Sequence, residues 1–540
     1  MTRRSWTTPA RLRVRLALVV VAMALVAAGC SSGGDGGADA GLDEEPARAA
    51  VQDLRVAVGD DPFNPTVPDI GLRLNGPNPG IFERLTTLTP TFGVAPGLAT
   101  RWESPSPTVW RFTLRPNVLF HDGTPLNGAA AAAALNVLAE RQTRPRGVEP
   151  GGARAAGDLA VEITLSMPNA RLPEQLAAPN MGLASPGTRP GVGDSPATTP
   201  TGTGPFTFVS YTPGSELKVK ANERYWGEKP ALTTLTFRFG PPPDASRLLA
   251  TRQVDVVGMV PYQHLAAVSG RTDRRVSSPA GTAVYLLLNT GGIDEFTTLK
   301  DDNVRKAVVL ALDRKALAEQ GFAEHGDTSD TLIPPLVIGE DAAERVNPPA
   351  RDVPESRRLL DQAGWAQGPD GMRSRDGRRL VLSVLLSRPA DHERAVEVLR
   401  SQLTEVGIGL QVQEAPEGVF TQVRRSAFDL FLEARGQDDA NPCGLCRLFS
   451  IRPGGQLDYA TAVGGGARAD ELFDRVFEAP SVDTARRLAA DMVNLVTAER
   501  MTAASIAVLR TEWLVSPRVQ SFDPAAFPGD QRWNTVWLGV

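Results

Sequence analysis

The first thirty residues constrain this chain most, because they decide in which compartment the rest of it must fold. Five arginines and no acidic residue stand among residues 1–15, and thirteen consecutive apolar residues follow from Leu16 to Ala28. This order is typical of an export signal. A helix of thirteen residues covers about 20 Å, less than the roughly 30 Å hydrocarbon core of a bilayer. We therefore expect residues 1–29 to be a signal peptide rather than a permanent membrane span.

The end of the apolar run indicates a lipid anchor. The sequence Val26-Ala27-Ala28-Gly29-Cys30 resembles a bacterial lipobox, in which the cysteine sulfur is lipidated and the cysteine becomes the mature N-terminus. An ordinary signal with an incidental cysteine is the alternative. Residues 30–50 are rich in Gly, Ala and acidic residues, which predicts a flexible tether. We expect a lipoprotein held at Cys30 on the outer face of the cytoplasmic membrane.

Composition narrows the classes of function. The length of 540 residues predicts about three domains. A net charge of −5 offers no basic face for phosphates, so we expect no nucleic-acid partner. The chain has only four histidines and three cysteines, which nearly excludes a metal site built from several soft ligands. We therefore expect neither a metal nor a cofactor.

Beyond residue 50, the apolar pattern predicts alternating strands and helices. Period-two or wholly apolar runs predict strands, at residues 54–58, 110–115, 206–209, 217–219, 235–239, 284–288 and 410–412. Ala- and Leu-rich or helically spaced apolar residues predict helices, at residues 129–141, 303–321 and 394–406. This alternation is typical of the α/β class with mixed sheets.

Four blocks of sequence resemble the extracytoplasmic solute-binding proteins of peptide and nickel importers, known as family 5. The resemblance extends over nearly the whole chain. The four blocks span residues 97–126, residues 202–227, residues 288–314 and residues 359–365. One position departs from the family, because Asn127 stands where the helix after Thr124-Pro125 usually starts with an acidic residue. That change weakens the expected helix cap.

The resemblance implies a two-lobed, periplasmic-binding-protein-like fold of the class II or cluster C type. Lobe 1 would combine residues 51–88, 200–283 and 500–540, with an inserted domain at 89–199, and lobe 2 would cover 284–499. Chain crossings near Ala283 and Arg500 would form the hinge. The family also implies a monomer that is not an enzyme, binds a peptide or similar small solute between its lobes, and delivers it to an ABC permease.

The expected ligand site follows a strand predicted at residues 428–432. The polar run after this strand would form a loop at its carboxyl end, where open α/β sheets bind ligands. In peptide-binding members a carboxylate pairs with the peptide's ammonium group, and the matching position is Asp438. The family often has an aromatic residue where this chain has Arg435, which puts an oligopeptide ligand in doubt. The resemblance also implies ligand contacts at Asn64 and Asn78.

Two further motifs allow other functions. Cys443 and Cys446 have a spacing that suits either a structural disulfide, the expected state outside the cytoplasm, or thiol-disulfide exchange. The alternative functions are thus an extracytoplasmic oxidoreductase that uses this pair, or a solute sensor on the same fold. His121 beside Asp122 is expected to belong to a turn, not to a catalytic pair.

Overall fold

The computed structural model describes residues 46–59, 78–140, 144–188, 200–240, 247–260, 273–293, 295–416, 418–436, 440–452, 457–526 and 528–540. All elements named below lie in one compact unit, residues 47–540. Cys30 and Asn64 lie outside the described residues, and so does Asp438.

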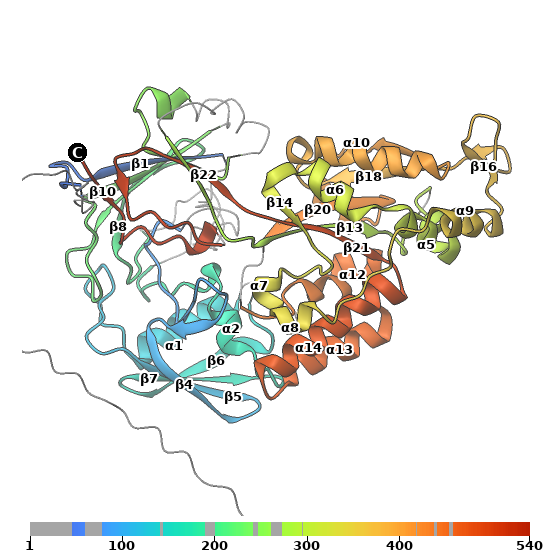
Figure 1. Ribbon diagram of the computed structural model, residues 1–540. Coiled ribbons are helices and arrows are strands. Elements are labelled where there is room, and N and C mark those ends of the chain that lie inside the picture. Colours follow the sequence, from blue (N-terminus) through green and yellow to red (C-terminus); the bar gives the residue numbers. More distant parts are fainter. Residues whose placement is uncertain are drawn as a thin grey trace, which may run out of the picture. The chain divides into compact units, whose positions relative to one another are not determined.

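A seven-stranded sheet forms the core of lobe 1 (Figure 1). β1 pairs in parallel with β10 and β11, and the other neighbours are antiparallel. Buried aromatic and aliphatic side chains cover it, among them Trp513, Trp533 and Phe237. In sheet order the strands are β12 (Arg274–Ser277), β22 (Glu512–Val515), β11 (Val256–Gly258), β1 (Asp53–Val58), β10 (Thr234–Phe239), β9 (Glu216–Ala221) and β8 (Phe206–Thr212).

The inserted domain of lobe 1 has its own core between a four-stranded antiparallel sheet and helix α1 (Gly128–Ala139). The expected weakness of the α1 cap is wrong, because Asn127 Oδ1 accepts a hydrogen bond from the Ala130 N–H at 2.9 Å. β2 (Thr86–Leu88) pairs with β3 (Val94–Pro96), and the short helix α2 (Leu172–Leu176) contributes Leu172 and Leu176 to the same core. The sheet order is β4 (Ala99–Ser106), β5 (Val109–Leu114), β7 (Ala160–Leu165) and β6 (Val148–Gly157).

A six-stranded mixed sheet forms the centre of lobe 2. β18 is parallel to β19 and β20, whereas β13 is antiparallel to β20 and β21. The two faces of this sheet pack against two separate hydrophobic cores. In sheet order the strands are β14 (Gly326–Thr328), β21 (Ala503–Leu509), β13 (Thr282–Leu288), β20 (Leu430–Gly436), β18 (Val381–Leu386) and β19 (Gly409–Val412).

Helices cover both faces of the lobe 2 sheet. The single helix expected at residues 303–321 is instead two helices, because the Asp313 side chain accepts from the Ala316 N–H and starts a second one. The helices are α5 (Asp302–Ala311), α6 (Arg314–Gly321), α7 (Pro335–Ile338), α8 (Glu340–Ala343), α9 (Val353–Gln362), α10 (Pro389–Glu405), α11 (Val419–Arg424), α12 (Leu457–Val463), α13 (Gly466–Glu478) and α14 (Val482–Asn494).

Two neighbouring segments connect the sheets of the two lobes. The chain passes from β12 to β13 through residues 278–281 and returns from β21 to β22 through residues 510–511. The segments bond to each other, since the Ser278 N–H donates to the Thr511 carbonyl at 2.9 Å and the Thr511 N–H donates to Ser278 Oγ at 2.8 Å. The sequence predicts the two chain crossings of a hinge near Ala283 and Arg500, and we use the name hinge below for residues 278–281 and 510–511.

The sequence-based prediction of an α/β fold with mixed sheets is confirmed. Every predicted strand is present, at β1, β5, β8, β9, β10, β13 and β19.

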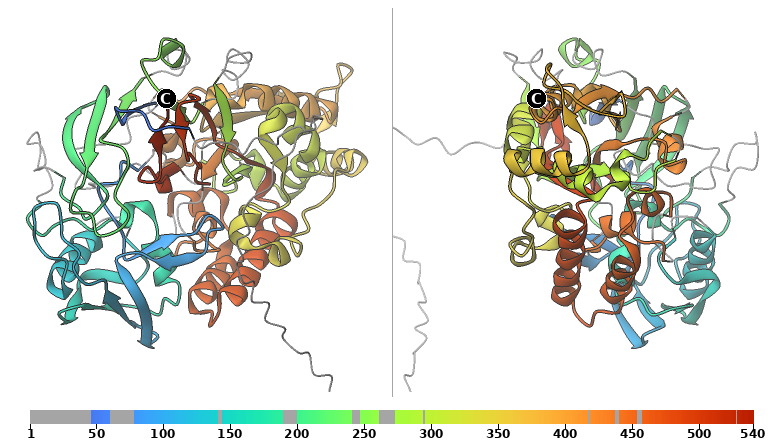
Figure 2. Two further views of the ribbon diagram at one scale, coloured as in Figure 1. Left: turned by 60° about the vertical axis from the view of Figure 1, so that its left-hand side comes forward. Right: turned by 90° about the vertical axis from the view of Figure 1, so that its right-hand side faces the viewer.

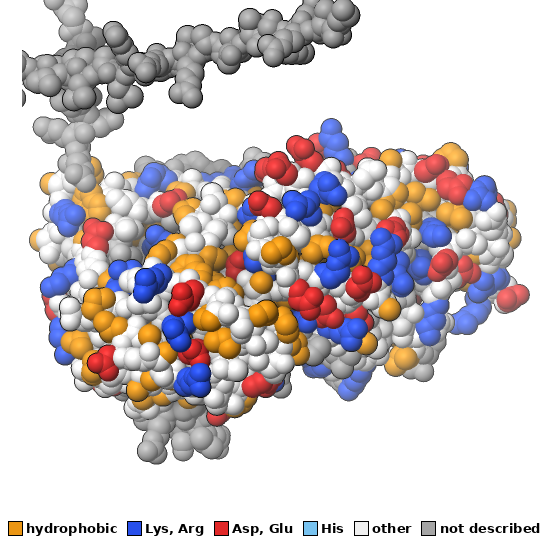
Figure 3. Space-filling view, turned by 90° about the horizontal axis from the view of Figure 1, so that it is seen from below, with side chains coloured by type: hydrophobic (Ala, Val, Ile, Leu, Met, Phe, Trp, Pro, Cys, Tyr) orange, Lys and Arg blue, Asp and Glu red, His pale blue; other side chains and the backbone are white. Residues whose placement is uncertain are grey.

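Lys and Arg side chains are interspersed with Asp and Glu on the face shown in Figure 3. Smaller sheets complete the described fold, namely β15 (Ala366–Gln367) with β16 (Arg373–Arg375) and β17 (Arg378–Arg379), and β23 (Val519–Gln520) with β24 (Trp537–Leu538).

Candidate functional site

The polar residues expected in a loop after residue 432 begin inside strand β20. The strand continues to Gly436, so Glu433 and Arg435 belong to it, and the prediction that the polar run forms a loop is wrong for these residues. Pairing with β13 over seven residues extends the strand. Side chains alternate along a strand, and Glu433 and Arg435 therefore lie on the face of Phe431, opposite Leu432.

Glu433 is almost fully buried, and its partners are all hydrogen-bond donors or cations. The Tyr285 hydroxyl donates to it at 2.9 Å and the Tyr459 hydroxyl at 3.2 Å. Burial raises the pKa of Glu433, while Arg435 and the two hydroxyls oppose that shift. Burial and the nearby Glu433 also raise the pKa of both tyrosines, which keeps their hydroxyls protonated. We call Glu433, Tyr285, Tyr459 and Arg435 the β20 polar cluster.

Arg435 lies at the carboxyl end of the strand, at the outer edge of the β20 polar cluster. Its Nη1 is 3.6 Å from Glu433 Oε1, and its guanidinium carbon lies 5.8 Å from the centre of the Tyr459 ring. The side chain is 20% exposed. It is therefore a cation that the fold holds in place at the point where β20 ends.

The segment after β20 leads to a buried disulfide. Residues 437–439 lie outside the described residues, and Asp438 with them. Cys443 and Cys446 are bonded to each other, and the Asn441 side chain supports the turn by accepting from the Cys443 N–H at 3.0 Å. Both half-cystines are 0–2% exposed and belong to a hydrophobic core of lobe 2. Reactive cysteines are usually partly exposed, so this burial favours a structural role.

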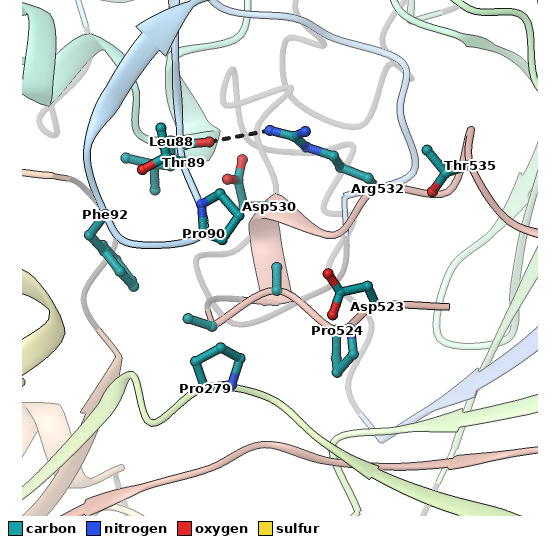
Figure 4. Close-up of a pocket in the computed structure, with 12 residues that line it drawn as sticks. Leu88, Thr89, Pro90, Phe92, Pro279, Asp523, Pro524, Asp530, Arg532 and Thr535 are labelled. Carbon is teal, nitrogen blue, oxygen red and sulfur yellow. Dashed lines mark hydrogen bonds between the residues drawn. The ribbon is translucent and has the colours of Figure 1, made fainter. Parts of the chain in front are cut away.

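A pocket of about 220 Å³ lies beside the hinge (Figure 4). Its walls are mainly apolar, and Figure 4 shows Pro90 and Phe92 on one side with Asp523 and Pro524 on the other. Three separate stretches of chain contribute. They are the β2–β3 turn, the hinge at Pro279, and the C-terminal segment from Asp523 to Thr535.

The charged groups of the pocket differ in their partners. Asp530 forms an ion pair with Arg84 of lobe 1. Arg532 Nη2 donates to the Leu88 carbonyl at 3.4 Å. Asp523 is exposed, and its carboxylate has no hydrogen-bond or ion-pair partner among the described residues. The pocket thus offers the Asp523 carboxylate, which has no partner among the described residues, and the Arg532 guanidinium, on a mainly apolar wall that also includes Thr89, Asp530 and Thr535.

The pocket and the end of β20 lie at the same edge of the lobe 2 sheet. Thr282, which begins β13, pairs in register with Gly436, which ends β20. Pro279 of the pocket lies three residues before Thr282 in the chain. Gly281 packs so closely on the C-terminal segment that a Cβ there would lie 2.6 Å from the Ala526 carbonyl oxygen. Arg435, one residue before the end of β20, is therefore near the same edge as the pocket.

Two of the residues singled out in the sequence have structural partners. Asn78 Oδ1 accepts from the Gly80 N–H at 2.8 Å and stabilises a turn. His121 Nδ1 accepts from the Gly202 N–H at 3.3 Å, and its Nε2 lies 3.0 Å from the Gly204 carbonyl oxygen. Both ring nitrogens of His121 are thus in contact with backbone groups, and the residue lies in a turn as predicted.

Several polar residues of this region were not predicted from the sequence. Glu433 could have been found, because a carboxylate within the apolar run FDLFLEA needs buried partners if the run is a strand. No pattern pointed to Tyr459, Asp523 or Arg532. Within the described part of the chain, no three His, Cys, Asp or Glu side chains form a group that could hold a metal ion. No described helix is both long and apolar enough to cross a membrane.

Comparison with known proteins agrees with this architecture. Residues 93–454 match the family model described as bacterial extracellular solute-binding proteins, family 5, middle. Protein XP55 of Streptomyces lividans is 30% identical over 386 residues, which is 70% of this chain and 68% of that protein. The dipeptide-binding protein of Escherichia coli is 26% identical over 338 residues, or 57% of this chain and 62% of that protein.

A solved structure shows the same fold. The crystal structure of NikA from Brucella suis in complex with Fe(III)-EDTA has a TM-score of 0.74, with 22% identity, and the match covers 90% of this chain and 99% of that one. The family model and this fold agree with the two lobes described above. The chain therefore belongs to family 5 of the bacterial extracellular solute-binding proteins.

Proposed function

We propose that this protein is the lipid-anchored solute-binding component of an ABC importer, and that it captures a peptide or a similar small solute beside the hinge. The observation that carries the proposal is the pocket at the edge where β20 ends, since it is bordered by lobe 1, by the hinge and by the C-terminal segment. A solute bound there would lie against lobe 1 and the hinge, next to the edge of the lobe 2 sheet at which β20 ends, so that closure of the lobes would bring the end of β20 toward it.

The size and charge of the pocket suit a small polar solute. A cavity of about 150 Å³ can hold benzene, so 220 Å³ accommodates a somewhat larger molecule. The unpaired Asp523 and the Arg532 guanidinium supply groups of opposite sign on its wall. A zwitterionic solute with an apolar body, such as a short peptide, matches this combination.

Native mass spectrometry of the full chain, purified from membranes in mild detergent, tests the solute proposal. We expect a bound molecule of peptide-like composition that denaturation releases, and calorimetry with that molecule then gives its affinity. A protein that carries no solute and binds none of a panel of di- and tripeptides would contradict the peptide part of the proposal.

Asp438 is proposed as the partner of the solute's ammonium group. Loss of one member of a buried charge pair costs about 2 to 5 kcal/mol, or roughly 30-fold to several thousandfold in affinity. We therefore expect Asp438→Ala to weaken binding by that amount. Asp439→Ala is the matched control and should change binding little, because the family resemblance matches the ligand carboxylate to Asp438 and not to Asp439. Equal losses in both variants, or full binding of an N-acetylated ligand, would contradict this assignment.

The lipid anchor is proposed at Cys30. Two or more acyl chains anchor a protein stably where one chain is marginal. We expect the mass of the N-terminal peptide to include the lipid, and Cys30→Ala to remain unprocessed with its signal peptide attached. Recovery of a lipidated Cys30→Ala variant, or of wild-type protein free of lipid, would contradict the anchor.

A further inference from the structure

The inserted domain of lobe 1 is in direct contact with one helix of lobe 2, α13. Figures 1 and 2 show α13 beside this domain. The contacts join residues that are several hundred positions apart in the chain. We call this set of contacts the clasp; on the inserted domain it comprises Arg146, Ala170 and Arg171, and on lobe 2 it comprises Phe473, Asp474, Phe477 and Ala479.

Arg146 is the centre of the clasp. The residue is only 7% exposed, and its Nη2 lies 2.5 Å from Asp474 Oδ1. Its guanidinium carbon lies 4.8 Å from the centre of the Phe477 ring and 5.4 Å from that of Phe473. Nε and Nη1 have no hydrogen-bond partner among the described residues, so the aromatic faces supply their surroundings. Asp474 also faces Arg452 Nε at 3.4 Å, which places this carboxylate between two cations.

Two further bonds fasten the carboxyl end of α13 to the inserted domain. The Ala170 N–H donates to the Phe477 carbonyl at 2.6 Å, and Arg171 Nη2 donates to the Ala479 carbonyl at 3.3 Å. The last carbonyls of a helix have no partner within the helix. Here the opposite lobe supplies donors for two carbonyls at this end of α13.

These contacts would break if the lobes moved apart about the hinge. Opening would break the Arg146–Asp474 ion pair, remove the aromatic rings from the guanidinium and leave two carbonyls at the end of α13 without their donors, and these losses favour the arrangement with the clasp formed. The contacts involve protein groups only, so this preference does not require a solute. A solute that binds the closed arrangement gains apparent affinity when that arrangement is already populated.

We propose that Arg146 is a positioning residue that holds the lobes closed without touching the solute, and thereby sets how tightly the solute binds. The consequence for affinity rests on the proposed solute-binding function. The clasp itself can be tested without any solute, so its failure is distinguishable from a failure of that function.

Hydrogen exchange of the full chain, followed by mass spectrometry without added solute, measures opening of the clasp. The reporter is the Ala170 amide, whose hydrogen bond crosses between the lobes. We expect Arg146→Met to speed its exchange about 10- to 100-fold, the range for loss of a charge-assisted hydrogen bond. Amides of β7 in the inserted domain should keep their wild-type rates, because the domain stays folded.

Two more variants sharpen the test. Asp474→Asn removes the charge of the lobe 2 partner and should speed hydrogen exchange of the same Ala170 amide. This variant tests the clasp independently if Arg146→Met does not fold. The matched control is Arg468→Met, which breaks an ion pair on the same helix, also at 2.5 Å, but with Glu499 of the same lobe. Unchanged Ala170 exchange in the clasp variants would overturn the proposal, as would equal acceleration in the control or equal acceleration of β7.

Discussion

His392 is a buried histidine whose environment makes stability depend on pH in a direction that can be worked out. It lies in the first turn of α10, is fully buried, and meets the Phe322 ring edge-on at 6.0 Å. Within the part of the chain that the structure describes, neither ring nitrogen has a hydrogen-bond partner. Burial lowers the pKa of His392 to about 3, and the nearby Arg388 contributes to the effect.

The size of the effect follows from the two pKa values. In the unfolded chain a histidine has a pKa of about 6.5. Below that pH the unfolded state binds a proton at this histidine and the folded state does not, which stabilises the unfolded state relative to the folded one. The contribution of His392 is therefore fully present above about pH 6.5 and is lost as the pH falls toward 3. The loss reaches about 2 kcal/mol at pH 5 and about 4 to 5 kcal/mol near pH 3, at about 1.4 kcal/mol per pKa unit.

The assay is urea unfolding of the wild type and of His392→Leu at pH 7, 6 and 5, followed by tryptophan fluorescence. Leucine has a similar volume and does not titrate, and it removes two buried nitrogens without partners. We expect the variant to be at least as stable as the wild type at pH 7, and to lose about 2 kcal/mol less between pH 7 and pH 5. Parallel pH dependences of the two proteins would refute the reasoning.

Two other substitutions test close packing and the β20 polar cluster, both by the same unfolding measurement at pH 7. Gly291→Ala should cost about 2 to 3 kcal/mol, because its Cβ would lie 2.0 Å from the Thr461 carbonyl oxygen. Gly240→Ala is the control, because a Cβ at this position would have no described atom within 4 Å, and it should leave stability unchanged or raise it by up to about 1 kcal/mol. A cost equal to that of Gly291→Ala would contradict the packing argument. Glu433→Ala should cost about 2 to 4 kcal/mol, since it leaves Arg435 without its carboxylate; a cost below about 1 kcal/mol would show that the pair contributes little.

The sequence predicted local structure better than the site, for physical reasons. Strands such as β10 and helices such as α10 follow from side-chain periodicity, which is a local property. The extension of β20 to Gly436 depends on pairing with β13, about 150 residues earlier in the chain, and the periodicity of its own residues does not contain that information. The break at Asp313 was visible in principle as a capping residue within an apolar stripe.

The candidate site was harder to predict because its parts come from distant segments. The pocket combines the β2–β3 turn, Pro279 and residues beyond Asp523, and nothing in one sequence links these positions. Arg146 and Asp474 are 328 residues apart. Arg435 was singled out only through the family resemblance, and the carboxylate that holds it, Glu433, was hidden in an apolar run.

The placement of the last strands has a consequence for the order in which the protein can be completed. β22 lies between β12 and β11 in one large sheet, and β21 lies between β14 and β13 in the other. The C-terminal ribbon, by which we mean β21 and β22 together, is therefore interior to both large sheets. Ser278 and Thr511 are 233 residues apart, which corresponds to roughly 10 to 50 seconds of synthesis at about 5–20 residues per second. Until that ribbon arrives, both sheets have a gap with unpaired strand edges. A chain that stops before residue 503 therefore leaves both sheets without a strand that lies between two others.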